Sequence, residues 1–112
     1  MPGLTIQRTE DASLDIRLQS DWYDVHAGAD ISERYLLSLV ETLNDLAAQP
    51  DLGRIRKFRN RRLARLRSFQ LQGSFHKHLV FYRVEDDTLV VFRVLQGMRD
   101  LPRRLLEPPG TE

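Results

Sequence analysis

The sequence predicts an α+β fold in which an antiparallel hairpin of two helices packs on one face of a twisted, mainly antiparallel sheet of four strands. Two observations support this fold class. The first half of the chain holds two stretches whose apolar residues recur at helical spacing. The second half holds two apolar, β-branched and aromatic runs that a short polar connection joins. The expected order is strand, helix, helix, strand, strand, strand.

The first strand and the first helix are predicted from residues 4–28. Leu4–Arg8 alternates apolar and polar residues, as a short strand does. Thr9 is suited to cap a helix whose first turn is acidic, and this helix is expected to end near residues 26–28. Its buried stripe is expected to consist of Leu14, Leu18, Trp22 and Val25, which makes Trp22 a core residue rather than a contact residue.

The second helix is predicted to begin at Asp30, where Glu33 completes a capping-box pattern. Gln49 and Pro50 end it. The loop between the helices is short, so the two helices are expected to form an antiparallel hairpin. The apolar face of the second helix is expected to consist of Tyr35, Leu36, Leu39, Val40, Leu43 and Leu46.

The most patterned stretch is a predicted β-hairpin within residues 75–100. Its apolar runs are Leu79–Val84 and Leu89–Leu95, and Glu85–Thr88 connects them. Leu63–Leu71 is expected to supply a strand before this hairpin.

Both faces of this hairpin are apolar if Val84 pairs with Leu89. The two helices can cover one face. We therefore expect the other face to be a hydrophobic ligand groove or to be closed by another chain. A β-bulge would bring Arg83 and Arg93 to the same side of the sheet, and the sequence leaves this open.

Length and composition indicate a single domain over residues 1–112, with a frayed tail from about residue 107. The chain has no cysteine, which excludes disulfides and thiol catalysis. No run approaches the roughly 18 apolar residues that a membrane span needs, and the N-terminus lacks an apolar signal core. We therefore expect a cytoplasmic protein without a membrane partner, while the oligomeric state stays open.

Charge is distributed unevenly along the chain. Residues 1–50 hold three arginines against nine acids, a balance of −6, whereas residues 51–104 hold 14 basic residues against five acids, a balance of +9. This pattern predicts a basic surface for nucleic acid or an acidic partner, the alternative being a solvated basic loop. The candidate binding residues are Arg54, Arg56, Lys57, Arg59, Arg61, Arg62 and Arg65, together with Arg99, Arg103 and Arg104.

Candidates for chemistry are few. His76 and His78 alternate along the expected strand, which would place both rings on one face. No third metal ligand is evident in the sequence, so we expect neither a metal nor a cofactor. Arg83 and Arg93 lie within apolar strands, where they either stabilise a phosphodiester transition state or pair with an acid such as Asp15.

An ordered series of segments runs through residues 4–104. The segments are Ala12–Ile16, Leu46–Arg54, Leu66–Phe69, His78–Val84 and Val94–Asp100. In order and spacing they resemble the RelE/ParE superfamily of toxins from bacterial type II toxin–antitoxin modules. The resemblance implies a small α+β toxin and a cognate antitoxin, which wraps the toxin through a helix and an extended segment.

The superfamily divides by target. RelE-like members cleave mRNA in the ribosome with basic residues and usually a tyrosine or histidine near the C-terminus, whereas ParE-like members lack that set and poison DNA gyrase. Here the segment after Val94 contains neither Tyr nor His, and Gln96 stands where ParE-like sequences commonly have a histidine. The resemblance therefore favours a ParE-like gyrase inhibitor with no chemistry of its own.

The alternative is a ribosome-dependent mRNA endonuclease. Its arginines would stabilise negative charge on the RNA, and a histidine or tyrosine would transfer protons. The candidates for these roles are Arg67, His78, Tyr82, Arg83 and Arg93. A third interpretation is a retired toxin that serves only to bind its antitoxin.

Overall fold

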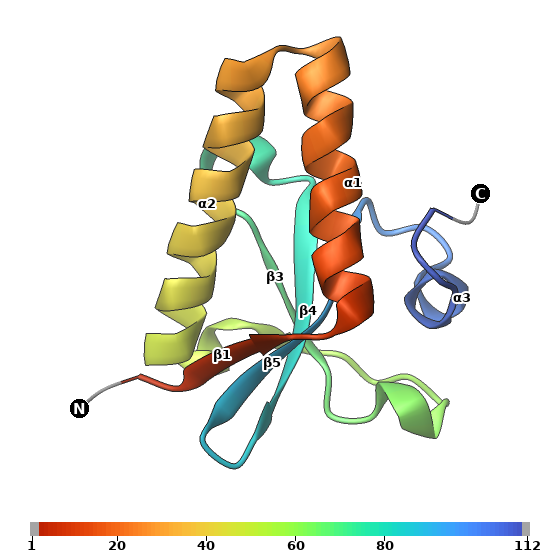
Figure 1. Ribbon diagram of the computed structural model, residues 1–112. Helices are drawn as coiled ribbons and strands as arrows, with labels where there is room; N and C mark the ends of the chain where they lie inside the picture. The colour runs from red at the N-terminus through yellow and green to blue at the C-terminus, as the bar shows by residue number, and fades with distance from the viewer. Residues whose placement is uncertain (1–2, 111–112) are drawn as a thin grey trace.

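Two long helices lie together on one face of a five-stranded sheet in the computed structural model, which describes residues 3–110 (Figure 1). The sheet order is β1-β5-β4-β3-β2, with β1 at Thr5–Arg8, β2 at Arg54–Ile55, β3 at Arg67–Gln70, β4 at His78–Glu85 and β5 at Thr88–Gln96. The helices are α1 at Glu10–His26, α2 at Ala29–Ala48 and α3 at Leu101–Leu106. Short 3₁₀ turns are η1 at Pro50–Leu52, η2 at Arg61–Leu63 and η3 at Gly73–Phe75.

The predicted fold class and the order of its main elements are confirmed. Among the described strands, β1 alone runs parallel to its neighbour, pairing with β5 over Thr88–Val91, and the other pairs are antiparallel. The fifth strand, β2, is an addition of two residues on the far side of β3. The strand predicted over Leu63–Leu71 is shorter and begins at Arg67, because Arg65 adopts a left-handed backbone conformation. In the described part of the chain, none of the helices has the length and hydropathy to cross a membrane.

Capping explains where the two long helices begin. Thr9 caps α1 as predicted, because its Oγ1 accepts a hydrogen bond from the backbone N–H of Ala12 at 3.0 Å. The capping box predicted at Asp30 was wrong. α2 begins at Ala29 after Gly28, whose φ of 98° favours glycine and which makes no side-chain cap. The predicted end of α2 at Gln49 is confirmed.

The central hairpin has the predicted register at its turn, since Val84 lies opposite Leu89. Farther along, Phe81 lies opposite Arg93 and Tyr82 lies opposite Val91, so the register shifts by one residue and leaves Phe92 as the bulge. Arg83 and Arg93 therefore lie on the same side of the sheet, the outcome that a bulge was expected to produce.

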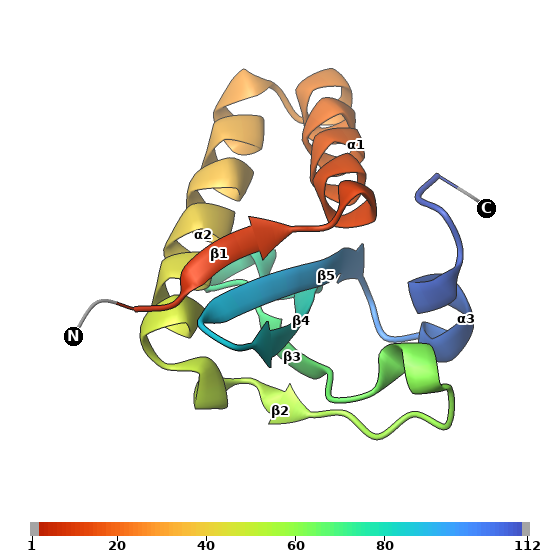
Figure 2. The same cartoon turned by 60° about the horizontal axis from the view of Figure 1, so that its bottom comes forward.

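Each face of the sheet carries its own hydrophobic core. The first core lies beneath α1 and α2 and includes Ile16, Tyr35, Leu39, Val80, Tyr82 and Val91. The second lies on the opposite face and includes Leu63, Leu66, Leu79, Phe81, Leu95, Leu101 and Leu105. The prediction of an apolar face open to a ligand or another chain was therefore wrong. The loop around η2 and helix α3 of the same chain cover that face, and they lie side by side in Figure 2.

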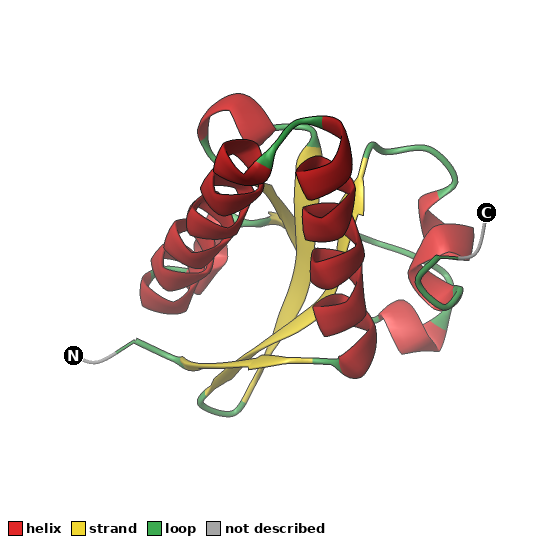
Figure 3. Cartoon of the chain, turned by 45° about the horizontal axis from the view of Figure 1, so that its top comes forward, coloured by secondary structure: helices red, strands yellow, loops and turns green. Residues whose placement is uncertain are grey.

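The apolar stripe predicted for α1 was also wrong. Leu18, Trp22 and Val25 are 41%, 52% and 79% exposed, and α1 instead buries Ala12 and Ile16. On α2, Leu36 and Val40 are exposed at the edge of the predicted face, whose other members are buried. Figure 3 shows α1 and α2 side by side in front of the sheet, with α3 beyond α1. Residues 107–110 of the expected frayed tail follow α3, while 111–112 lie outside the described residues.

Candidate functional site

A groove of about 450 Å³ runs between α1 and the C-terminal segment. Its floor is the end of β5, whose edge away from β4 has no strand beside it after Val91 because β1 stops there. One wall is the exposed flank of α1 and the other is formed by α3 and the residues after it. The lining residues are Asp15, Leu18, Gln19, Trp22, Arg93, Val94, Leu95, Gln96, Arg104, Glu107, Pro108 and Gly110.

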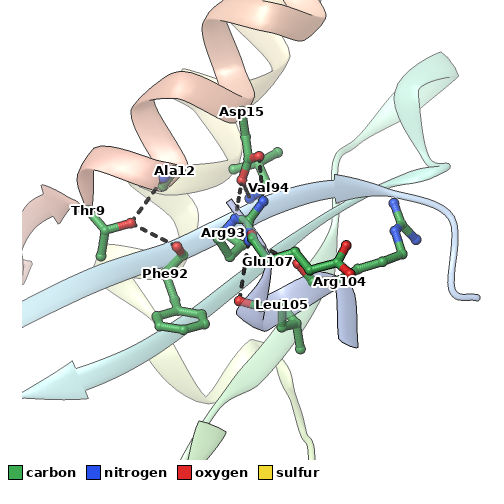
Figure 4. Close-up of polar contacts among 9 residues, drawn as sticks. All are labelled: Thr9, Ala12, Asp15, Phe92, Arg93, Val94, Arg104, Leu105 and Glu107. Atoms are coloured by element: carbon green, nitrogen blue, oxygen red, sulfur yellow. Dashed lines mark hydrogen bonds and ion pairs between the residues drawn. The ribbon is translucent and has the colours of Figure 1, made fainter. Parts of the chain in front are cut away.

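Side chains form hydrogen bonds with backbone groups at the free edge of β5 in this groove (Figure 4). Thr9 Oγ1 donates a hydrogen bond to the Phe92 carbonyl at 2.8 Å, and Asp15 Oδ2 accepts the backbone N–H of Val94 at 3.0 Å. Arg104 Nη2 donates to the Gln96 carbonyl at 2.7 Å. These caps block the pairing of an additional strand at this edge. A partner entering the groove therefore has to bind through its side chains, as an amphipathic helix does.

Arg93 connects three elements at the bottom of the groove (Figure 4). Its guanidinium forms a bidentate pair with Asp15, at 2.7 Å from Nε to Oδ2 and 2.9 Å from Nη2 to Oδ1. Its Nη1 donates to the carbonyls of Arg104, Leu105 and Glu107 at 2.9, 3.3 and 2.5 Å. Of the two roles that the sequence left open for Arg93, the pairing with Asp15 is the one observed. The side chain is 3% exposed, and its N–H groups form hydrogen bonds with α1 and with the end of α3.

Trp22 and Leu18, which were predicted to be buried, both line this groove. The Trp22 ring stacks on His26 with centroids 4.3 Å apart and rings tilted by 16°, and half of its surface faces solvent. The signal that could have corrected the assignment is a second apolar stripe on α1, formed by Ala12, Ile16 and Tyr23. A helix lying on a sheet can bury only one of two stripes, so the other was free for a partner.

Two of the nuclease candidates, Arg67 and Tyr82, lie opposite each other on β3 and β4 and hold the turn after α2. The Tyr82 hydroxyl accepts the Gly53 N–H at 2.9 Å and donates to the Pro50 carbonyl at 2.5 Å. Arg67 Nη1 donates to the Gly53 carbonyl at 2.8 Å. Burial raises the pKa of Tyr82 above its ordinary value, so the hydroxyl stays protonated at neutral pH. A side chain at Gly53 would collide with the Tyr82 ring.

The other strand candidates do not join this pair. Arg83 Nη2 donates to the Arg62 carbonyl at 2.9 Å, and its guanidinium lies over the Phe92 ring. His78 is 2% exposed, and its Nε2 lies 2.8 Å from the Tyr23 hydroxyl. Burial lowers the pKa of His78 to about 4, which leaves the ring neutral at pH 7. His78 and Arg83 lie five residues apart along β4, about 17 Å at the rise of a strand.

The expected histidine pair does not form, because His76 is exposed and lies before β4. Within residues 3–110, no three His, Asp or Glu side chains gather closely enough to hold a metal ion.

The predicted basic surface lies over the second core. The loop between β2 and β3 is anchored by the fully buried Leu63 and Leu66. Arg54 of β2 is exposed, and so are five cations of the loop, namely Lys57, Arg59, Arg61, Arg62 and Arg65. The half-buried Arg56 lies over the Phe58 ring.

The C-terminal arginines differ in their contacts. Arg99 is exposed, whereas Arg103 pairs with Asp100 and Glu107. Arg104 donates to the Arg99 and Gln96 carbonyls. Of these three, Arg99 is therefore the one that adds an unpaired, exposed cation to the basic surface.

Solved structures that share this fold include the following two. One is described as a chromosomal ParDE toxin–antitoxin system from P. aeruginosa, with a TM-score of 0.69 and 17% identity over 88% of this chain and 100% of that chain. The other is a RelBE toxin–antitoxin complex from Mycobacterium tuberculosis, with a TM-score of 0.59 and 23% identity over 86% of this chain and 93% of that chain. No curated protein sequence matches the chain.

The family model described as "ParE toxin of type II toxin-antitoxin system, parDE" matches residues 6–101. This range runs from β1 to the start of α3, and so includes both long helices, all of the sheet except Thr5, and most of the groove. The predicted resemblance is thereby confirmed, and this chain belongs to the ParE family of toxins of type II toxin–antitoxin systems.

Proposed function

We propose that this toxin inhibits growth by binding and poisoning DNA gyrase, and that its cognate antitoxin neutralises it by filling the groove beside α1. The observation that carries the gyrase proposal is that none of the nuclease candidates on β3, β4 and β5 offers a free group for proton transfer. The segment after Val94 has no Tyr or His, His78 is buried and neutral, and the Tyr82 hydroxyl is held by backbone groups. Inhibition by binding requires no such group.

The antitoxin proposal is supported by the two apolar stripes of α1. Leu18, Trp22 and Val25 remain exposed although a stripe of this kind normally faces a partner surface. Trp22 has the size and rigidity of a typical interface anchor. The solved structures with the same fold are described as toxin–antitoxin complexes, which fits a partner for this groove.

A supercoiling assay tests the gyrase proposal. Purified gyrase, relaxed plasmid and ATP are incubated with increasing amounts of toxin. We expect supercoiling to fall and cleaved DNA to accumulate near stoichiometric toxin, and we expect prior addition of antitoxin to prevent both. Supercoiling that proceeds unchanged at stoichiometric toxin would contradict the proposal.

A binding measurement tests the groove. The product of the neighbouring open reading frame is coexpressed with the toxin, and the affinity of the purified pair is measured for Trp22→Ala and for Leu37→Ala. Both side chains are exposed, but Leu37 lies on α2 outside the groove. We expect Trp22→Ala to weaken binding at least about tenfold and Leu37→Ala to have little effect. Equal effects, or the absence of any complex, would count against the proposed site.

The alternative function is a ribosome-dependent mRNA endonuclease. The observation in its favour is the pairing of Tyr82 with Arg67 beside the basic loop. Site-specific cleavage of mRNA on ribosomes, lost in Arg83→Ala, would favour this alternative over gyrase inhibition.

A further inference from the structure

We propose that the toxin binds the phosphate backbone of double-stranded DNA directly through its basic face. The basic face is defined by the exposed side chains of Arg54, Lys57, Arg59, Arg61, Arg62, Arg65 and Arg99. This binding belongs to the toxin chain itself and does not require gyrase. It goes beyond the proposed function by assigning a nucleic-acid site to a surface distinct from the antitoxin groove.

The charges of the basic face are not neutralised within the chain. Among residues 3–110, the arginines that form ion pairs are Arg67, Arg83, Arg93 and Arg103, and none of these belongs to the basic face. Seven cations on one surface without a carboxylate partner repel one another, which lowers stability unless an anion binds there. Duplex DNA presents phosphates at high linear density and releases counterions when cations replace them.

The loop that carries most of these cations is held in place by the rest of the fold. The Arg56 N–H donates to the Leu66 carbonyl at 2.9 Å, and the Asn60 side chain accepts the Arg62 N–H at 2.8 Å. From the sheet, Arg83 donates to the Arg62 carbonyl at 2.9 Å. The backbone is therefore ordered before any ligand arrives, which reduces the entropic cost of binding.

The chemistry of the basic face favours a duplex over a single strand. Single-stranded nucleic acids bind to exposed aromatic rings on which bases stack. The aromatic residues near this face are only half exposed, and two of them are covered by arginine, Phe58 by Arg56 and Phe92 by Arg83. Contacts with a backbone need guanidinium groups and no stacking platform.

A protein partner is less well matched to the same surface. Protein interfaces usually have an apolar centre, but the leucines of the loop, Leu63 and Leu66, are completely buried. The exposed apolar side chains closest in sequence are Leu52, Ile55 and Met98. Ile55 follows Arg54 along β2, so its side chain points to the opposite side of the sheet.

The rest of the molecule orients this face toward a polyanion. The exposed acids of α1 and α2 lie across the sheet from the basic face. They are Glu10, Asp11, Asp21, Asp24, Asp30, Glu33, Glu41 and Asp45. A polyanion is repelled by the helix side and attracted to the loop side, so encounters with DNA occur in one orientation.

Fluorescence anisotropy with a labelled duplex of about 25 base pairs tests the proposal. The toxin alone is titrated at several salt concentrations, beside Arg59→Gln/Arg61→Gln/Arg62→Gln and the matched control Arg8→Gln/Arg17→Gln/Arg34→Gln. Both variants lose three exposed arginines, but the control removes them from β1, α1 and α2. Circular dichroism confirms that each variant is folded.

We expect wild type to bind at physiological salt with a dissociation constant in the range of about 10⁻⁴ to 10⁻⁶ M, which is typical of contacts without base recognition, and to bind more tightly at low salt. The loop variant is expected to bind at least about tenfold more weakly and to lose about 2.7 from the slope of log affinity against log salt, since each phosphate contact contributes about 0.9. The control variant is expected to bind within about twofold of wild type or more tightly.

Three results would overturn the proposal: no binding to the duplex at low salt, equal losses in the two variants, or tighter binding to single-stranded RNA or polyglutamate of similar length. Gyrase inhibition by the same proteins separates the two proposals. A toxin that inhibits gyrase but does not bind DNA contradicts this inference alone. A toxin that binds DNA but leaves supercoiling unchanged contradicts the gyrase proposal alone.

Discussion

Tyr82 and Tyr35 are both fully buried, but their hydroxyl groups have different contacts. The Tyr82 hydroxyl bonds to Gly53 and Pro50, whereas the Tyr35 hydroxyl has no donor or acceptor among the described residues. We expect Tyr82→Phe to lower the free energy of unfolding by about 1–3 kcal/mol, because it leaves backbone groups unpaired. Tyr35→Phe is expected to be neutral or stabilising. Urea denaturation of both variants measures the difference, and a larger loss for Tyr35→Phe would contradict this assignment.

The burial of His78 predicts a dependence of stability on pH. Its pKa falls from an ordinary value of about 6.5 to about 4 in the folded state, because desolvation disfavours the charged ring. The unfolded chain therefore binds a proton at a higher pH than the folded chain does. This contribution to stability is complete above about pH 6.5 and is lost as the pH falls toward 4, by about 2–3 kcal/mol at pH 4.5.

Denaturation at pH 7 and at pH 4.5 checks this prediction. We expect His78→Gln to lose less stability than wild type between the two pH values, by about 2–3 kcal/mol. The exposed His76 provides the matched control, since His76→Gln is expected to keep the wild-type pH dependence. The prediction fails if both variants follow the wild-type curve.

Single residues were predictable from sequence where the signal is local. The Thr9 cap depends on neighbours within one helical turn, and it formed as expected. The pairing of Arg93 with Asp15 was one of two alternatives, because the cost of a buried unpaired charge demanded either a partner or a function. Trp22 was misassigned because periodicity shows that a helix has an apolar stripe but does not identify which of two stripes meets the sheet.

At the scale of elements, the ion pair of Arg93 and Asp15 holds α3 against the rest of the fold. Asp15→Asn removes the carboxylate and leaves a buried guanidinium without a counter-ion. We expect a loss of about 3–5 kcal/mol in the free energy of unfolding. Arg93 also binds the last carbonyls of α3. We therefore expect Asp15→Asn to accelerate amide hydrogen exchange, relative to wild type, more in α3 than in β4.

An exposed pair supplies the control for this experiment. Arg103→Gln breaks the pairs with Asp100 and Glu107 at the surface and is expected to cost less than about 1 kcal/mol. Asp15→Leu combined with Arg93→Met removes both buried charges and is expected to be more stable than Asp15→Asn. Similar losses for Asp15→Asn and Arg103→Gln would show that the buried pair does not hold α3.

The elements that sequence did not predict are those defined by distant contacts. The covering of the second sheet face depends on Leu63 and Leu66, two leucines within a loop whose arginines indicated a solvated or partner-binding segment. The packing of α3 likewise depends on Leu101 and Leu105, which lie in the same core. The charge of a segment indicates where its polar atoms go and says little about the few apolar residues that anchor it.

Across the whole molecule, the candidate site was only partly predictable for the same reason. The loop that carries most of the exposed arginines lies beside α3, because the two pack together over the second core. The groove was not predicted, since its walls come from α1 and from the C-terminal segment, which are far apart in the sequence and are joined by the Arg93 contacts. The charge of a continuous segment can be read directly from the sequence, whereas a groove depends on which distant segments fold together.

The groove and the basic face share no lining residue, and the single tryptophan lies in the groove. Trp22 is half exposed, so burial by the antitoxin is expected to shift its emission to shorter wavelength and to protect it from acrylamide quenching. Duplex DNA is expected to leave both signals unchanged and to leave the antitoxin-induced shift intact. A fluorescence titration of the toxin with antitoxin, with DNA and with both together measures this. A blue shift caused by DNA alone, or loss of the antitoxin signal in the presence of DNA, would mean that the two ligands compete for one surface.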